Sequence, residues 1–224
     1  MDIARQYSNN KLNEGLVVFA ESQTKARGRI GKSWVSKENE NIAFSILLYP
    51  DSKMINQLTI ASSVIISQYL ETINLSPEIK WPNDVLINQK KIAGILVESH
   101  FQEGSETSAI VGIGLNVNYY PQIELTNGKI TTSISNEIGH TIDRTQILVE
   151  LLKSFNDIYL SNIRWDQVFT YWKKHLITIG RKVTITTNNN IEISGIAESV
   201  DNNGALVVRK QNGEIEYIDY GEIV

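Results

Sequence analysis

The chain carries a basic, glycine-containing segment at residues 25–34, KARGRIGKSW. Glycine lets a backbone approach a phosphate closely, and arginine presents a fork of donors to anionic oxygens. Trp34 could cover an apolar ligand or stack on a ring. The segment therefore suits an anionic ligand such as a nucleotide, with a solvated basic loop as an equal alternative from the residues alone. The spacing between Gly28 and Gly31 is too short for a Walker A phosphate loop.

A second candidate is the segment at residues 80–84, KWPND. Pro82 cannot donate a hydrogen bond to a sheet ladder, so it ends a strand or lies at a sheet edge. The proline also helps to fix Asn83 and Asp84, whose amide and carboxylate can hold a nucleotide or Mg²⁺.

The segment at residues 90–98, KKIAGILVE, begins with two lysines and continues as an apolar strand. Lys91 is suited to be a fixed cation that faces a carboxylate or an α-phosphate. Gly94 would let a ligand approach the strand backbone closely. A lysine that simply extends from the strand end into solvent is the plainer interpretation of the same pattern.

Residues 111–118, VGIGLNVN, form a third candidate. The Gly-x-Gly is too short for a dinucleotide fingerprint, and no helical pattern follows it. Asn116, at a strand end, could contact phosphate or a metal, or it could serve only the turn. The few histidines are widely spaced and no Gly-x-Ser-x-Gly elbow occurs, so neither a zinc site nor a hydrolase triad has support.

Composition narrows the classes of protein to consider. Lys and Arg number 21 against 25 Asp and Glu, which gives a net charge of −4 over 224 residues. This balance argues against a surface built mainly to bind nucleic acid. The absence of cysteine excludes disulfides, thiolate zinc sites and cysteine nucleophiles. No signal peptide or membrane-length apolar run is present, so the sequence predicts a cytoplasmic protein without membrane association.

Hydrophobic periodicity predicts the elements that must position these segments. Strands are predicted at residues 16–20, 42–49, 79–81, 85–87, 92–100 and 108–114. Helices are predicted at residues 2–10, 54–73, 143–158 and 165–175. The mixture indicates an α+β fold, with a mixed, largely antiparallel sheet and flanking helices.

After Gly180, short β-branched runs alternate with turns rich in asparagine and glycine. This pattern predicts a small all-β barrel of a size that would be only marginally stable alone. We therefore expect two domains, at residues 1–177 and 178–224, that pack together and contribute to one site.

The order and spacing of the basic loop, KWPND, KKIAGILVE and GIGLNVN strongly resemble biotin protein ligases. The resemblance covers nearly the whole chain. It includes ESQT at residues 21–24, before the basic loop. The family's C-terminal domain is similar to three segments of the tail, ISGI at residues 193–196, NGAL at 203–206 and GEI at 221–223. It implies a class II synthetase-like biotin ligase catalytic domain followed by an SH3-like β-barrel.

The activity that the resemblance implies is ATP-dependent and has two steps. Biotin is first activated to biotinyl-5′-AMP with release of pyrophosphate, and the biotinyl group then passes to a lysine of a biotin carboxyl carrier domain. ATP and Mg²⁺ are the expected cofactors, and biotin is the substrate. The expected partner is the carrier protein or domain of a biotin-dependent carboxylase. Binding to DNA or to a membrane is not expected, and a homodimer is compatible with the resemblance. The resemblance is to the monofunctional type, which lacks an N-terminal DNA-binding domain.

The resemblance also implies residue roles, carried over motif by motif. Lys91 and Arg29 would be the catalytic residues. Residues expected to bind biotin are Gln23, Arg27, Gly28, Arg29, Trp34, Lys91 and Gly94. Residues expected to bind ATP and Mg²⁺ are Arg27, Lys80, Asn83, Asp84 and Asn116.

The sequence departs from the family pattern at both ends. It begins at Met1 without the Ser/Thr-Thr-Asn segment that family members carry before the element reading DIA here. It ends at Val224, where many relatives continue to an arginine. Two alternatives therefore stand beside the biotin ligase: a lipoate or octanoate ligase with a differently shaped pocket, and an inactive, truncated module that binds biotin or docks the carrier. The Trp-Pro-Asn-Asp segment favours biotin over lipoate.

Overall fold

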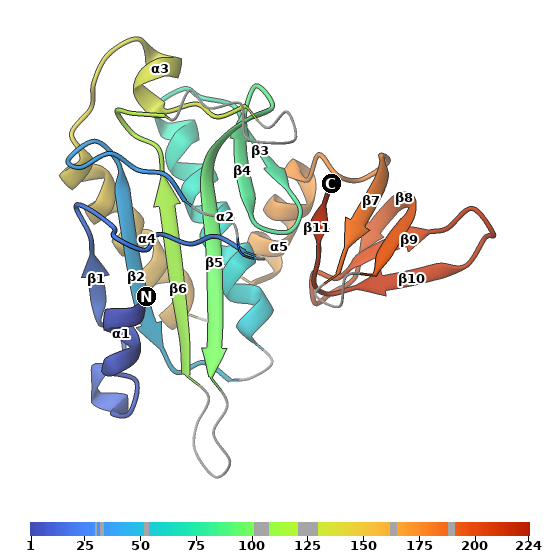
Figure 1. The fold of residues 1–224 in the computed structure, drawn as a ribbon, viewed down its shortest axis with the longest axis horizontal. Coiled ribbons are helices and arrows are strands. Elements are labelled where there is room, and N and C mark those ends of the chain that lie inside the picture. Colours follow the sequence, from blue (N-terminus) through green and yellow to red (C-terminus); the bar gives the residue numbers. More distant parts are fainter. Residues whose placement is uncertain are drawn as a thin grey trace.

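One antiparallel sheet of six strands forms the centre of the larger region (Figure 1). The computed structural model describes residues 1–29, 31, 34–51, 54–100, 108–120, 130–161, 165–187 and 191–224. The strands of this six-stranded sheet are β1 (Val17–Phe19), β2 (Ile42–Leu48), β3 (Pro77–Lys80), β4 (Asp84–Ile87), β5 (Lys90–His100) and β6 (Ser108–Leu115). They lie in the order β1-β2-β6-β5-β4-β3, and every neighbouring pair is antiparallel.

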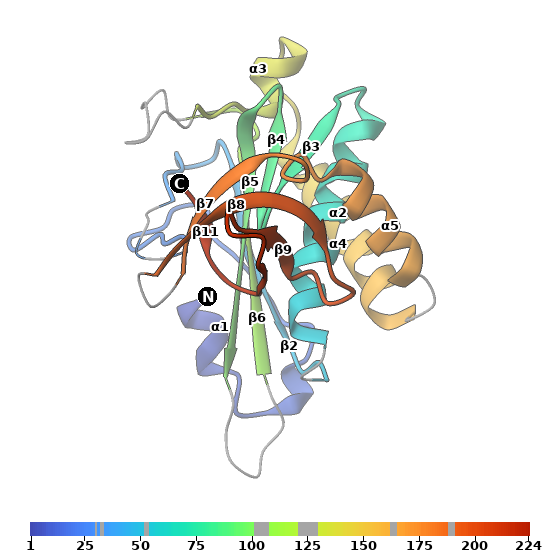
Figure 2. The same cartoon turned by 90° about the vertical axis from the view of Figure 1, so that its right-hand side faces the viewer.

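Helices cover one face of this sheet. The helical elements are α1 (Asp2–Gln6), the 3-10 turn η1 (Lys11–Asn13), α2 (Ile55–Thr72), α3 (Ile134–Ile138), α4 (Arg144–Ser161) and α5 (Trp165–His175). Figure 2 shows α2, α4 and α5 on one side of the sheet, with α1 and the basic loop on the other. The two faces therefore differ: the helical side holds the main core, and the other side carries α1 on a small apolar cluster of Ala4, Leu47 and Ile110.

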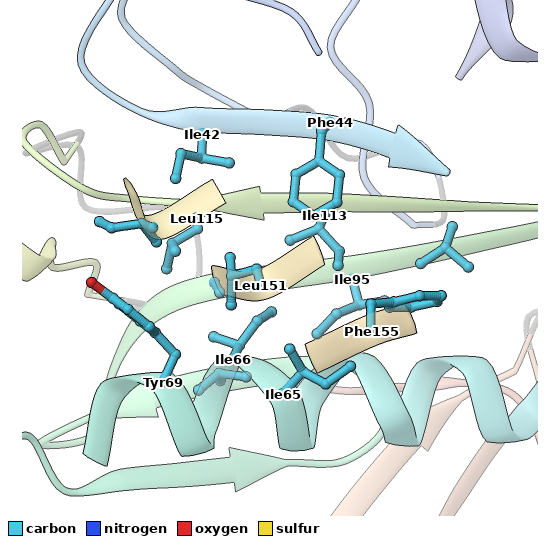
Figure 3. Close-up of a cluster of buried hydrophobic side chains, with 14 of the residues drawn as sticks. Ile42, Phe44, Ile65, Ile66, Tyr69, Ile95, Ile113, Leu115, Leu151 and Phe155 are labelled. Carbon is cyan, nitrogen blue, oxygen red and sulfur yellow. The ribbon is translucent and has the colours of Figure 1, made fainter. Parts of the chain in front are cut away.

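The main core forms where apolar side chains of α2 and α4 pack against the sheet. Ile65 and Ile66 of α2 point toward Ile113 on β6, and Leu151 of α4 lies among them (Figure 3). Strand β2 is buried along its whole length, because the sheet's central strands are covered on both faces. Burial of such side chains contributes about 25 cal/mol per Å² of apolar surface, which makes this core the main source of stability.

The C-terminal region forms a second antiparallel sheet, in the order β10-β9-β8-β7-β11. Its strands are β7 (Lys182–Thr186), β8 (Glu192–Val200), β9 (Leu206–Arg209), β10 (Ile215–Ile218) and β11 (Glu222–Ile223). Figure 2 shows these strands curving in an arc. The antiparallel strands are confirmed, but the predicted barrel is not closed: no pairing joins β10 to β11 within the described residues. The physical reason is that β11 has only two residues and pairs with β7 alone.

A second core joins the two regions. It combines Val64 on the far side of α2, Trp172 of α5 and Leu206 of the C-terminal sheet, all almost fully buried. Trp81, in the turn before β4, donates its indole N–H to the carbonyl of Gly204 at 3.1 Å. The C-terminal sheet is thus packed into the larger region, and it reaches the KWPND turn directly.

The predicted order of strands and helices is confirmed along the chain. The first helix is shorter than predicted, since α1 ends at Gln6, and the short elements η1, α3 and β11 were not predicted. Among the helices of the described residues, none is long and apolar enough to span a membrane.

Candidate active site

A cavity of about 390 Å³ is lined by strands of the larger sheet and by segments that Figure 2 shows on the face away from α2. It lies between strands β4, β5 and β6, the basic loop at residues 21–36, and β11. Every site residue expected from the sequence lines it: Gln23, Arg27, Gly28, Arg29, Trp34, Lys80, Asn83, Asp84, Lys91, Gly94 and Asn116. Segments separated by many residues in the sequence are therefore brought to one place, although their roles stay predictions.

An ion pair between Lys91 and Asp84 lies at the centre of this cavity. Lys91 Nζ is 2.6 Å from Asp84 Oδ1, and the two side chains are only 23% and 16% exposed. Asp84 begins β4 and Lys91 is near the start of β5, on the two arms of one hairpin. The register shifts between Val85 and Leu86, which lets these two residues meet. The sheet thus holds a cation and a carboxylate together in a half-buried position.

Glycines on neighbouring strands form the floor of the cavity. Gly94 of β5 is paired with Gly114 of β6, and the indole ring of Trp34 lies against both. A Cβ atom at Gly114 would be 2.5 Å from Trp34 Cε2, closer than real atoms approach. Lys91 Nζ is 5.8 Å from the centre of the same ring, within cation–π range. Trp34 Nε1 is buried and has no hydrogen-bond partner, a donor that a ligand's acceptor group could satisfy.

The start of the chain closes one end of the cavity. The Met1 ammonium donates to Ser45 Oγ at 3.0 Å, and both residues line the cavity. A Cβ atom at Gly112 would be 2.9 Å from Met1 Sδ, so the methionine side chain packs directly on that strand. Burial lowers the pKa of the Met1 ammonium below its usual value.

Arg27 is held by carboxylates on two other elements. Its guanidinium donates to Glu98 of β5 at 3.0 and 3.1 Å and to Asp2 of α1 at 2.7 and 2.9 Å. Arg5 also contacts Glu98. The hydrogen bonds with Asp2 and Glu98 raise the pKa of Arg27 and keep it charged. The predicted ligand contact of Arg27 would therefore have to compete with two carboxylates.

Arg29 lies deeper, between the larger region and the C-terminal sheet. Burial lowers the pKa of Arg29, while the charges of Asp84 and Glu222 oppose this change. An arginine stays protonated through any physiological pH, so a partly buried cation lines the cavity here. The charge of Arg29 interacts with Asp84 of β4 on one side and with Glu222 of β11 on the other.

The side-chain amides of the site are oriented by backbone groups. Asn83 donates its Nδ2 to the carbonyl of Ile95 at 2.7 Å. Asn116 is only 1% exposed and donates its Nδ2 to the carbonyl of Thr132 at 2.9 Å. No group of three or more His, Cys, Asp or Glu side chains is placed to hold a metal ion within the described ranges.

Several residues of the cavity were missed by sequence reasoning. Ser45 and Thr131 line it without any motif of their own, and residues 221–223 resemble the family's C-terminal domain but were not predicted to reach the site. Gly112 and Gly114 belong to the motif GIGLNVN, but no contact with a ligand was predicted for them. Alternate glycines in a strand place two open positions on one sheet face, and this signal could have predicted the floor.

Comparison with known proteins identifies the family. Residues 2–118 match the biotin/lipoate A/B protein ligase family, and residues 178–224 match the biotin protein ligase C terminal domain. The chain belongs to the biotin/lipoate A/B protein ligase family.

Individual relatives agree with this assignment. The bifunctional ligase/repressor BirA of Bacillus subtilis is 34% identical over 94% of this chain and 66% of its own length. The biotin--[acetyl-CoA-carboxylase] ligase of Paracoccus denitrificans is 30% identical over 94% of each chain. The chain thus spans about two thirds of the first of these relatives and nearly all of the second. The structure of the biotin protein ligase from Aquifex aeolicus in complex with biotin and ATP matches with a TM-score of 0.80 and 26% identity, covering 99% of this chain and 93% of that one.

Proposed function

We propose that this chain is an ATP-dependent biotin protein ligase. It would convert biotin to biotinyl-5′-AMP with release of pyrophosphate, and then transfer the biotinyl group to a lysine of a carrier domain. The observation that carries the proposal is a cavity that gathers the Lys91–Asp84 pair, the glycine floor and the partly buried Arg29. The match of residues 178–224 to the biotin protein ligase C terminal domain supports biotin rather than lipoate.

The first step joins two anions and needs cations at the point of contact. A carboxylate oxygen of biotin attacks the α-phosphorus of ATP, and the bond from that phosphorus to the oxygen bridging to the β-phosphate breaks. Lys91 would stabilise the charge that gathers there, because its ammonium is held at the cavity by the strand and by its ion pair with Asp84. Arg29 would supply a second, partly buried cation from the loop.

The second step releases AMP. The amine of the carrier lysine attacks the acyl carbon of biotinyl-5′-AMP, the bond to the phosphate oxygen breaks, and the amine loses a proton. Asp84 is the carboxylate nearest to Lys91 and is suited to accept that proton. The amide bond formed to biotin is then complete.

Mg²⁺ would supply further neutralisation of the phosphates when it is bound. Protein sites for this ion commonly use one or two carboxylates and leave the remaining ligands to phosphates and water. Asp84, with the amides of Asn83 and Asn116 on the same cavity, fits that donor set. No larger carboxylate cluster is needed for an ion that arrives with ATP.

Water must be kept from the adenylate, because it would hydrolyse the mixed anhydride. Trp34 covers the glycine pair beside Lys91 with an apolar ring. A bound ligand would share this enclosed position, between the indole and the strands. We expect Gln23, Arg27 and Gly28 to complete the wall above biotin, as the resemblance implies.

The partner follows from the relatives. Similar proteins are named biotin--[acetyl-CoA-carboxylase] ligase, so we propose the carrier domain of a biotin-dependent carboxylase as the acceptor. The reaction would take place in the cytoplasm, where that enzyme and ATP occur together. A homodimer stays a prediction, which sedimentation of the purified chain would test.

Transfer to the carrier tests this function as a whole. The chain is incubated with ATP, Mg²⁺ and an unmodified carrier domain, together with biotin, lipoate or octanoate, and intact-protein mass spectrometry measures the adduct. We expect the biotin adduct alone, on one lysine. A lipoyl or octanoyl adduct would reassign the substrate, and no adduct with any acid would favour a module that binds without catalysis.

A further inference from the structure

A polar cluster behind the cavity is centred on Glu137 of α3, whose side chain is only 9% exposed. Glu137 Oε1 accepts a hydrogen bond from Thr132 Oγ1 at 2.5 Å, and Oε2 accepts one from Asn88 Nδ2 at 3.0 Å. Lys90 Nζ is 3.6 Å from Oε1, and Asn136 Nδ2 is 3.5 Å from it. One carboxylate therefore ties α3 and the segment before it to the turn between β4 and β5.

The electrostatics show that this carboxylate is ionised. Burial raises the pKa of Glu137, but the hydrogen bond from Thr132, the charge of Lys90 and the bond from Asn88 together outweigh burial. The pKa of Glu137 therefore lies below its usual value. A buried charge that has four polar partners resists displacement, because moving it would leave those partners unsatisfied.

Thr132 connects Glu137 to two residues of the cavity. Its backbone N–H donates to the carbonyl of Lys91 at 2.9 Å, and the N–H of Lys91 donates to the carbonyl of Ile130 at 2.9 Å. The carbonyl of Thr132 accepts the hydrogen bond from Asn116 Nδ2 at 2.9 Å. The segment at residues 130–132 thus lies beside the start of β5 like a short parallel strand, and it holds the backbone of Lys91 and the side chain of Asn116 together.

We propose that Glu137 is a positioning residue for adenylate formation: it fixes Thr132, and Thr132 in turn sets Lys91 and Asn116 for ATP. The inference rests on the proposed function, since it assigns both residues to the ATP half-reaction. Glu137, Thr132, Asn88 and Lys90 do not line the cavity, so Glu137 acts through its neighbours. Lys91 also lies beside the biotin side of the cavity, with its Nζ 5.8 Å from the centre of the Trp34 ring, whereas Asn116 is expected to serve ATP alone.

The test uses pyrophosphate exchange at varied ATP concentration, with two variants that break one link in different ways. Glu137→Ala removes the carboxylate, and Thr132→Val removes only the hydroxyl while the backbone hydrogen bonds to Lys91 stay. For each variant we expect the KM for ATP to rise roughly tenfold and kcat to fall, as lost buried hydrogen bonds predict. The Kd for biotin without ATP is measured beside it and should change less than the KM for ATP, because Lys91 serves both ligands whereas Asn116 is expected to serve ATP alone.

Two further variants separate positioning from general damage. Glu137→Gln keeps an oxygen that can accept from Thr132 and should recover most of the ATP affinity. Glu198→Gln makes the same chemical change in the exposed Glu198–Arg209 pair of the C-terminal sheet, and it should leave the KM for ATP unchanged. Should Glu137→Ala fail to fold, the nearly isosteric Thr132→Val still decides the matter.

A normal KM for ATP in Thr132→Val and in Glu137→Ala would overturn the positioning role. A fall in kcat alone that matches the loss of folded protein, measured by thermal unfolding, would overturn it as well, because unfolded molecules lower kcat without changing KM. An unsubstituted chain that gives no exchange with any acid would instead contradict the proposed function itself, so the two failures are distinguishable.

Discussion

The floor of the cavity lies on paired strands, whereas the wall opposite to it is the basic loop at residues 21–36, which has no regular secondary structure in its described part. On the floor, Lys91 and Asp84 are fixed by the ladder of β4 and β5 and meet at 2.6 Å. In the loop, Arg27 is fixed by side chains alone, through Asp2 and Glu98. The strands thus hold Lys91 at a defined point, whereas the loop, which also carries Arg29, is held at Arg27 by exchangeable ion pairs and can admit a ligand.

The sharpest way to test this contrast is Lys91→Ala on the floor. The substitution removes the cation at the reacting centre, so pyrophosphate exchange should fall at least about 10³-fold, as expected for loss of a positioned charge. Exchange rates at saturating biotin and ATP measure the effect. Retention of more than a tenth of the activity would show that the floor cation is not the reacting group.

Gly114→Ala tests the geometry of the floor rather than its charge. A Cβ atom there would lie 2.5 Å from Trp34 Cε2 and displace the ring. We expect biotin affinity to fall about tenfold, the cost of overpacking one methyl group. Isothermal titration with biotin measures it, and the double variant Gly114→Ala with Trp34→Ala is the control. Equal losses in the single and double variants would show that the ring is not what the methyl group displaces.

Arg29→Gly moves the test to the loop. It removes the partly buried cation whose charge interacts with Asp84 and Glu222, and we expect biotinyl-5′-AMP to leave the site about tenfold faster, the lower limit for one lost hydrogen bond to a charged group. Release is followed with radiolabelled ATP in a filter assay. An unchanged rate of release would remove the loop from retention of the intermediate.

Glu98→Gln should have the smallest effect. The carboxylate pairs with Arg27 and Arg5, but its side chain is 26% exposed and Arg27 is 36% exposed, so solvent screens the pairs. The free energy of unfolding should fall by about 1 kcal/mol or less, and kcat for exchange should stay within about twofold. Chemical denaturation and exchange rates measure the two quantities. A fall in kcat of tenfold or more would mean that the ion pairs of Arg27 order the whole loop.

The sequence predicted the helices and strands and most residues of the site, but not the contacts between distant segments. The period of apolar residues marked α5 well, since it buries one stripe of its surface. The same period located α2, but that helix is buried on nearly all sides because it lies between two cores. The residues of the cavity were recognised because KWPND and KKIAGILVE keep their chemistry within a few positions. Arg27 and Glu98 are 71 residues apart, and nothing local indicates that they pair. Thr132 and Glu137 were not predicted either, because their contacts with the hairpin of β4 and β5 form only in the folded chain.

Pyrophosphate exchange into ATP tests the central claim most directly, because it requires the cavity and ATP but no carrier domain. Biotin, lipoate and octanoate are compared with the unsubstituted chain and with Lys91→Ala. The account predicts exchange that depends on biotin alone and is abolished in Lys91→Ala. Exchange with lipoate or octanoate, or biotin-dependent exchange that survives in Lys91→Ala, would contradict it.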